Sequence, residues 1–177
     1  MKNILIVTFL SLLNVSVFSQ NIVKTESKVD FKIGSVLWSK VKGYIPEIHG
    51  KAKFDKNNLS NSSFDVYVAV KGINTDNEKR DEHLKTADFF DVEKYPNMSF
   101  KSTGIKKDNE GYIATGKLTV KDVTKTVNIP FVANEENGKT QLIGTLEIDR
   151  LDYNVGVDQS KMLVDKKVKI TITCVVE

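Results

Sequence analysis

The stretch that decides the fold is KVKITITCVV, residues 167–176 near the end of the chain. Apolar side chains occupy every second position from Val168 to Val176, and lysines and threonines occupy most positions between them. Such alternation puts the apolar side chains on one face of a β-strand and the polar ones on the other. One buried and one wet face is typical of antiparallel sheets, because buried parallel strands are apolar on both faces.

The same alternation recurs through most of the chain, and Asp, Asn and Gly turn signals separate the rows. The second row contains Pro46 and Gly50, so we expect that strand to be bent or broken. Eight one-sided strands predict an all-β fold, a closed antiparallel barrel or a sandwich. The strands are expected near residues 28–34, 41–54, 63–71, 97–104, 111–120, 125–133, 140–150 and 165–176.

One segment departs from this pattern. Residues 75–78 read Thr-Asp-Asn-Glu, the Thr-x-x-Glu form of a capping box. Residues 78–87 then contain good helix formers, with Leu84 and Ala87 as a narrow apolar edge. The sequence therefore predicts a short helix that lies over an opening of the sheet.

The first nineteen residues have the three-part pattern of a secretory signal peptide. Lys2 is followed by an apolar run over residues 4–13 and by small and polar residues over 14–19. The run is too short for a membrane-spanning helix, and no later segment is apolar enough to span a membrane. We therefore predict that residues 1–19 are cleaved and that residues 20–177 form one domain. That domain is expected to be periplasmic or secreted.

Composition excludes several classes of site. The single cysteine, Cys174, rules out a disulfide framework, and two histidines, His49 and His83, leave little material for a metal site. No metal and no cofactor is predicted. The 26 Lys and Arg and 23 Asp and Glu residues are interspersed, so no nucleic-acid-binding surface is expected. No pattern specifies an oligomeric state.

Two features leave alternatives open. Arg80 and His83, three residues apart, share a helix face and either contact one polar ligand group or form a solvated surface with ordinary ion pairs. Small inward residues, Ala114, Gly116 and Gly144, would leave a lumen lined by apolar side chains unless bulky neighbours fill it. Periodicity does not decide between a hollow and a filled interior.

Several runs resemble the YceI-like family, in order from about Val29 to Val176. These runs are RDEHL (80–84), ADFFDVEKYP (87–96), GKLTV (116–120), VTK (123–125) and IDRLDY (148–153). The resemblance implies an exported bacterial protein with an eight-stranded, lipocalin-like antiparallel barrel and a short helix near its mouth. It also implies that the lumen holds a polyisoprenoid or similar long apolar molecule, and it transfers no catalytic residues.

The chain departs from the family pattern at Asn154, where glycine is common after Asp152 and Tyr153. Asparagine tolerates a left-handed backbone conformation better than most residues, so the turn is expected to survive.

The leading hypothesis is an exported protein, not an enzyme, that sequesters or carries an isoprenoid or other long-chain lipid. The alternatives are an interaction or stress-response module with a filled barrel, and an enzyme that acts on an isoprenoid lipid or quinone. The residues expected to line the lumen are Phe64, Val66, Val68, Phe100, Leu118, Ile129, Phe131, Leu146, Ile148 and Ile170. Those expected at the mouth are Arg80, His83, Leu84, Phe89 and Phe90.

Overall fold

The structure, a computed structural model, describes residues 20–35, 39–158 and 164–177. The predicted signal peptide, residues 1–19, lies outside the described residues. The strands are β1 (Lys28–Ser35), β2 (Ser39–Pro46), β3 (His49–Lys53), β4 (Ser63–Ala69), β5 (Asn97–Asp108), β6 (Gly111–Val120), β7 (Val123–Glu136), β8 (Lys139–Asp149) and β9 (Val164–Val176). The helices are α1 (Glu78–Lys85) and four 3₁₀ turns, η1 (Lys24–Glu26), η2 (Leu59–Asn61), η3 (Val70–Gly72) and η4 (Arg150–Tyr153).

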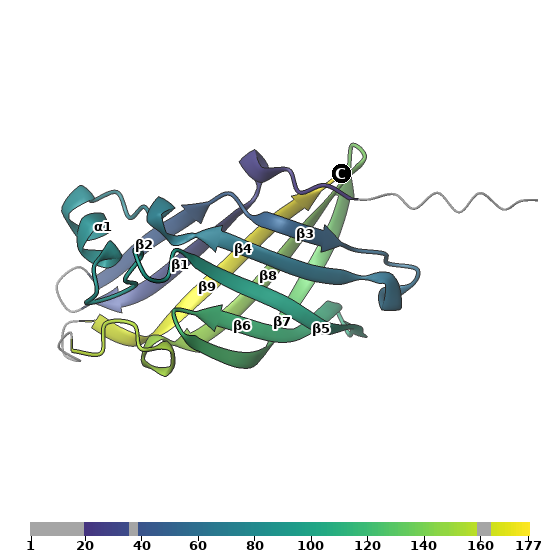
Figure 1. The fold of residues 1–177 in the computed structure, drawn as a ribbon. Coiled ribbons are helices and arrows are strands. Elements are labelled where there is room, and N and C mark those ends of the chain that lie inside the picture. Colours follow the sequence, from purple (N-terminus) through teal and green to yellow (C-terminus); the bar gives the residue numbers. More distant parts are fainter. Residues whose placement is uncertain (1–19, 36–38, 159–163) are drawn as a thin grey trace, which may run out of the picture.

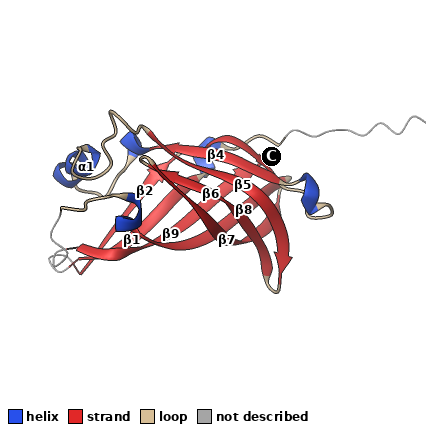
Figure 2. Ribbon diagram, turned by 60° about the horizontal axis from the view of Figure 1, so that its bottom comes forward, coloured by secondary structure: helices blue, strands red, loops and turns tan. Residues whose placement is uncertain are grey.

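All nine strands belong to one antiparallel sheet in the order β2-β1-β9-β8-β7-β6-β5-β4-β3. The sheet is strongly curled, a half-barrel, and α1 lies at one of its ends (Figures 1 and 2). Its two edges, β2 and β3, are consecutive in the chain, and only two residues separate them. Three Cα–Cα steps span at most roughly 11 Å, so this link holds the two edges near each other.

The all-β antiparallel prediction is confirmed, and the prediction of eight strands is wrong. The expected strand at residues 41–54 is broken into β2 and β3 because Glu47, directly after Pro46, has a positive φ of 57°. At Gly50 a Cβ atom would lie 2.3 Å from the Asp65 carbonyl oxygen, so only glycine fits there. The break adds a ninth strand. No ladder between β2 and β3 closes the sheet in the described residues; a bridge between Tyr44 and Asn74 lies at the β2 edge.

Two local predictions have different outcomes. Asn154 adopts the left-handed conformation, φ 55° and ψ 32°, so the expected turn is present. The helix is also present, but its capping residue is Asn77, whose side chain accepts a hydrogen bond from the Arg80 backbone N–H. The predicted cap Thr75 instead donates to the carboxylate of Asp81. A local contact between Thr75 and a helix residue six positions later has therefore taken the place of the predicted capping box.

The end of the sheet away from α1 is filled by aromatic rings. Phe54 lies edge-on to Phe131 and Tyr112, with ring centroids 5.6 and 4.8 Å apart, and Phe64 is also edge-on to Phe131. We call these four residues the aromatic plug. The small residues predicted to leave a lumen border bulky groups instead. A Cβ on Gly144 would lie 2.9 Å from the Ile129 side chain.

Candidate functional site

The other half of the curled sheet encloses a cavity of about 640 Å³. This volume lies within the range of small-molecule sites, roughly 300–1,000 Å³. Its wall is mainly Val, Ile, Leu, Phe and Met, and it extends from the inner face of the sheet to α1 and η4. The residues from the sheet include Val29, Phe31, Ile33, Val41, Ile45, Val66, Val68, Met98, Phe100, Leu118, Val120, Ile129, Leu146, Ile148, Val168, Ile170 and Ile172.

Most of the expected lumen residues border this cavity. They are Val66, Val68, Phe100, Leu118, Ile129, Leu146, Ile148 and Ile170. Phe64 and Phe131 do not, because they belong to the aromatic plug at the filled end. The cavity also removes the premise of the filled-barrel alternative, which required an interior without connected space.

All five residues expected at the mouth line the cavity: Arg80, His83, Leu84, Phe89 and Phe90. Lys79 and Asn77, which were not predicted, line it as well. Lys79 and His83 are exposed to solvent and also border the cavity, so the cavity reaches the surface beside α1. None of the α1 residues is buried.

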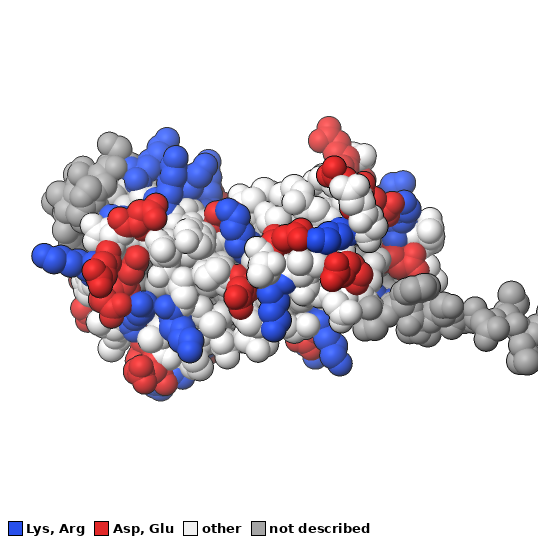
Figure 3. Space-filling model, turned by 90° about the horizontal axis from the view of Figure 1, so that it is seen from above, with Lys and Arg blue, Asp and Glu red and all other residues white. Residues whose placement is uncertain are grey.

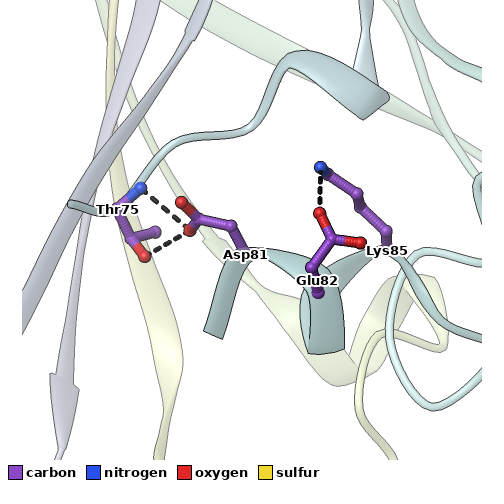
Figure 4. Close-up of polar contacts among 4 residues, drawn as sticks. All are labelled: Thr75, Asp81, Glu82 and Lys85. Carbon is purple, nitrogen blue, oxygen red and sulfur yellow. Dashed lines mark hydrogen bonds and ion pairs between the residues drawn. The ribbon is translucent and has the colours of Figure 1, made fainter. Parts of the chain in front are cut away.

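A buried threonine fixes the position of α1 against the sheet. Thr75 is 4% exposed, and its backbone N–H and hydroxyl both donate to Asp81 (Figure 4). The same hydroxyl and the Thr75 carbonyl oxygen accept from the Arg80 guanidinium at 2.8 and 2.7 Å. Glu82 and Lys85 form a separate ion pair one turn apart. The Arg80 charge is therefore held in a fixed place at the cavity wall.

His83 has one acidic and one aromatic neighbour. Its Nε2 lies 3.1 Å from a carboxylate oxygen of Asp88, and its ring lies edge-on to Phe89 at 5.1 Å between centroids. The local polar partners expected for Arg80 and His83 are present, and contact of these side chains with a ligand stays a prediction. The two side chains have local partners, and they also border the cavity.

Arg150 is a residue of the cavity wall that sequence reasoning missed. It is 4% exposed, and its guanidinium donates to the carbonyl oxygens of Val155, Gly156 and Asp165 at 2.6–2.9 Å. Burial lowers the pKa of this guanidinium below its ordinary value, but an arginine stays charged. The side chain ties the loop after η4 to the start of β9, and no local periodicity could reveal that role.

Among the described residues, every formally charged one that lines the cavity is basic: Lys79, Arg80 and Arg150. Their positive charge favours a ligand with acceptor or anionic groups at the α1 end, in addition to the carbonyl partners that Arg80 and Arg150 already have. The aliphatic wall residues favour an apolar body.

The described part of the chain offers little support for metal binding or for a reactive thiol. It contains no group of three or more His, Cys, Asp or Glu side chains placed to hold a metal ion. Burial raises the pKa of the Cys174 thiol to about 11, so this cysteine is protonated at neutral pH. Neither α1 nor any other described helix has the length and apolar character needed to cross a bilayer.

Comparisons with other proteins agree with this architecture. A UPF0312 protein of Vibrio parahaemolyticus is 30% identical over 151 residues, which cover 81% of this chain and 80% of that protein. The protein YceI of Escherichia coli is 35% identical over 101 residues, 57% of this chain. That match spans about half of the relative's length, 53%.

Three solved structures have a similar fold. Burkholderia cenocepacia BcnA matches with a TM-score of 0.81 at 24% identity, covering 88% of this chain and 99% of that one. The Campylobacter jejuni YceI protein matches with a TM-score of 0.70 at 28% identity, covering 77% and 85%. A polyisoprenoid-binding domain from Saccharophagus degradans matches with a TM-score of 0.71 at 11% identity, covering 90% and 98%.

The pattern of a family model described as the YceI-like domain matches residues 20–176 of the chain. This match covers all nine strands, α1 and the cavity that they enclose. The chain therefore belongs to the YceI-like domain family.

Proposed function

We propose that the protein binds one long apolar molecule, a polyisoprenoid or a similar lipid, and carries or stores it shielded from water. The observation that carries this proposal is the apolar cavity of about 640 Å³ that reaches the surface beside α1. Each buried methylene contributes about 0.8 kcal/mol, so a chain of many carbons binds without specific polar contacts. The similar fold of a polyisoprenoid-binding domain supports the same ligand class.

The ligand enters tail first in this proposal. The aromatic plug blocks the far end, so the tail points toward Phe131 and the head stays beside α1. There Lys79 and Arg80 meet an anionic or acceptor-rich head group, and His83 completes the rim. A charge-assisted hydrogen bond to such a head is stronger than a neutral one.

Export is part of the proposal, because residues 1–19 follow the signal-peptide pattern. Fractionation of the producing cells, followed by N-terminal sequencing, tests it. We expect a chain that begins at Gln20, in the periplasm or the culture medium. Recovery of a chain that keeps residues 1–19 in the cytoplasm would contradict export.

Solvent extraction of the purified protein followed by mass spectrometry tests the ligand. We expect a bound lipid, or uptake of an added polyprenol by the emptied protein. The variant Ile170→Trp fills part of the cavity and should lose most of the lipid. Val132→Trp adds the same ring at a residue that is 41% exposed and absent from the cavity wall, and it should retain the lipid. An empty wild-type protein that also takes up no polyprenol would refute the proposal.

The enzyme alternative makes a different prediction for His83. Under the binding proposal, His83→Ala retains most of the lipid, and neither protein converts it to a product. Conversion of an isoprenoid lipid or quinone by the wild type that is lost in His83→Ala would replace the binding role with catalysis.

A further inference from the structure

Three lysines form a row across the outer face of the sheet. Lys42 on β2 lies directly opposite Lys32 on β1, and Lys32 lies directly opposite Lys169 on β9. All three are exposed. Their chain neighbours Phe31 and Ile170 line the cavity, so the three lysines project from the opposite face. We call them the lysine row.

This arrangement is electrostatically unfavourable for the fold. Like charges directly opposite one another on adjacent strands destabilise a sheet. Elsewhere a lysine opposite an acid forms an ion pair, as Lys101 does with Asp65 at 2.8 Å. No member of the lysine row forms an ion pair with a described residue. The repulsion within the row is therefore not offset by an ion pair of any of its three lysines.

Glu147 on β8 lies directly opposite Lys169. Its bond to Lys167 and, less strongly, attraction to Lys169 lower the pKa of Glu147, so this acid offsets part of the charge at one end of the row. Asp30 is paired with Lys28 at 3.0 Å, and Glu147 is paired with Lys167 at 2.9 Å. Asp165 lies over Gly34 on the neighbouring part of β1 and adds a negative charge there. Exposed Lys40, two residues before Lys42, adds another positive charge. Figure 3 shows basic side chains gathered at one end of the molecule, with acidic side chains beside them.

The lysine row lies on the outside of the wall that leads to the mouth. A Cβ on Gly43, next to Lys42, would lie 2.7 Å from the Asn74 carbonyl oxygen and 2.8 Å from Thr75, the residue that positions α1. Lys32 and Lys169 also border a surface hollow of about 550 Å³ on the sheet, whose wall includes the acids Asp30 and Glu147 as well. Positive charge and the cavity entrance therefore belong to one region of the molecule.

We propose that the lysine row docks the protein on an anionic phospholipid bilayer, with the mouth close to the membrane that supplies or receives the apolar ligand. The choice of a bilayer over another polyanion rests on the proposed lipid-binding function. An anionic surface offsets the repulsion within the row, and each lysine near such a surface strengthens binding about fivefold.

Sedimentation with vesicles tests the docking. We expect the purified protein to bind vesicles of equal parts phosphatidylglycerol and phosphatidylcholine but not of phosphatidylcholine alone. Salt near 1 M should release it, because the screening length falls to about 3 Å. The variant K32Q/K42Q/K169Q should bind the anionic vesicles about a hundredfold more weakly.

A matched variant, K106Q/K107Q/K117Q, removes three exposed lysines from β5 and β6 and should keep most of the binding. Urea unfolding shows whether a variant that loses docking is still folded. Because repulsion is relieved, K32Q/K42Q/K169Q should unfold at the same or a higher urea concentration than the wild type. A variant that folds at least as well but no longer sediments supports the proposal.

Three results would overturn the docking proposal: wild-type protein that ignores anionic vesicles, equal losses in the two triple variants, or equally strong, row-dependent binding to duplex DNA. Lipid extraction from the same samples distinguishes the docking proposal from the proposal that the protein binds a lipid. A row variant that retains lipid but does not sediment supports docking, whereas a lipid-free wild type that takes up no polyprenol refutes only the ligand assignment.

Discussion

The two ends of the curled sheet use the same alternating strands and reach opposite outcomes. At the filled end, Phe131 lies against Phe54 and Tyr112 with centroids 5.6 and 5.3 Å apart, and small residues opposite make room for the rings. At the α1 end the inward residues are mostly aliphatic, such as Leu146 and Ile170, and they border about 640 Å³ of space. Alternation therefore determines which side chains face inward. The size of the inward side chains in each half of the sheet determines whether that half is filled or hollow.

The largest effect should come from removing the centre of the plug. Phe131 is 5% exposed, so Phe131→Ala deletes a ring packed on several sides and should lower the free energy of unfolding by about 3–5 kcal/mol. Leu146→Ala at the hollow end should cost less, about 2 kcal/mol, because that side chain already borders empty space. Urea unfolding measures both. Equal losses would show that the two ends are packed alike.

The next effect concerns Cys174, a buried residue of the core that contains Phe131. Burial raises the pKa of its thiol from 9.0 to about 11. Between about pH 9 and 11 the unfolded chain has lost this proton and the folded chain keeps it, so stability falls as pH rises. The loss should reach about 3 kcal/mol, and none is expected below pH 8.

Comparison with Cys174→Ala isolates this contribution, because lysines and tyrosines titrate in both proteins. Unfolding free energies measured from pH 7 to 11 should converge or cross for the two proteins. A constant difference across that range would show that the thiol is accessible to water.

A smaller effect tests the space beside Phe100, a residue of the cavity wall. In Gly116→Ala the new Cβ would lie 2.6 Å from the Phe100 ring and 2.4 Å from the Lys101 carbonyl oxygen, so overpacking should cost about 1–3 kcal/mol. Gly104→Ala is the matched control, because nothing lies within 4 Å of its Cβ position. Thermal unfolding should rank Gly104→Ala near the wild type and Gly116→Ala below it. The reverse order would mean that position 116 has room to spare.

The smallest global effect is expected at the mouth. Asn77→Ala removes the side chain that caps α1, a change that costs about 1 kcal/mol of helix stability. Because none of the α1 residues is buried, the helix should open locally while the sheet stays folded. Hydrogen exchange of the α1 amides should therefore accelerate about fivefold. Acceleration throughout β5 and β6 as well would show that α1 supports the whole fold.

Much of the fold was predictable because it depends on local periodicity. β6 occupies residues 111–120 as expected, and the break between β2 and β3 follows from the position of Pro46. The helix was also predicted at its observed place, but its cap was not, because Thr75 bonds to Asp81 of the helix and Asn77 caps the helix instead. Helix propensity describes a segment alone, whereas a capping side chain competes with every neighbour that the fold supplies.

The cavity wall likewise contains residues that the sequence predicted and residues that it did not. Val66, Val68 and Ile170 were predicted from alternation, and the unpredicted Phe31 and Ile33 follow the same rule on β1. Arg150 was missed because its partners are carbonyl oxygens of Val155, Gly156 and Asp165, which are brought to it by the loop after η4. No sequence pattern marks a residue whose role depends on backbone atoms.

The amino-acid sequence by itself determined the strands, their inward faces and the region of the mouth, because side-chain direction in a strand follows from position alone. Only the tertiary structure decided that the sheet stays unpaired between β2 and β3, and that one half of its interior is filled while the other is hollow. Those properties depend on how residues from different strands pack against one another, as Gly144 on β8 and Ile129 on β7 do. Whether the interior is filled depends on the volumes of side chains that are neighbours in space, and the order of residues in the sequence does not show which side chains are neighbours.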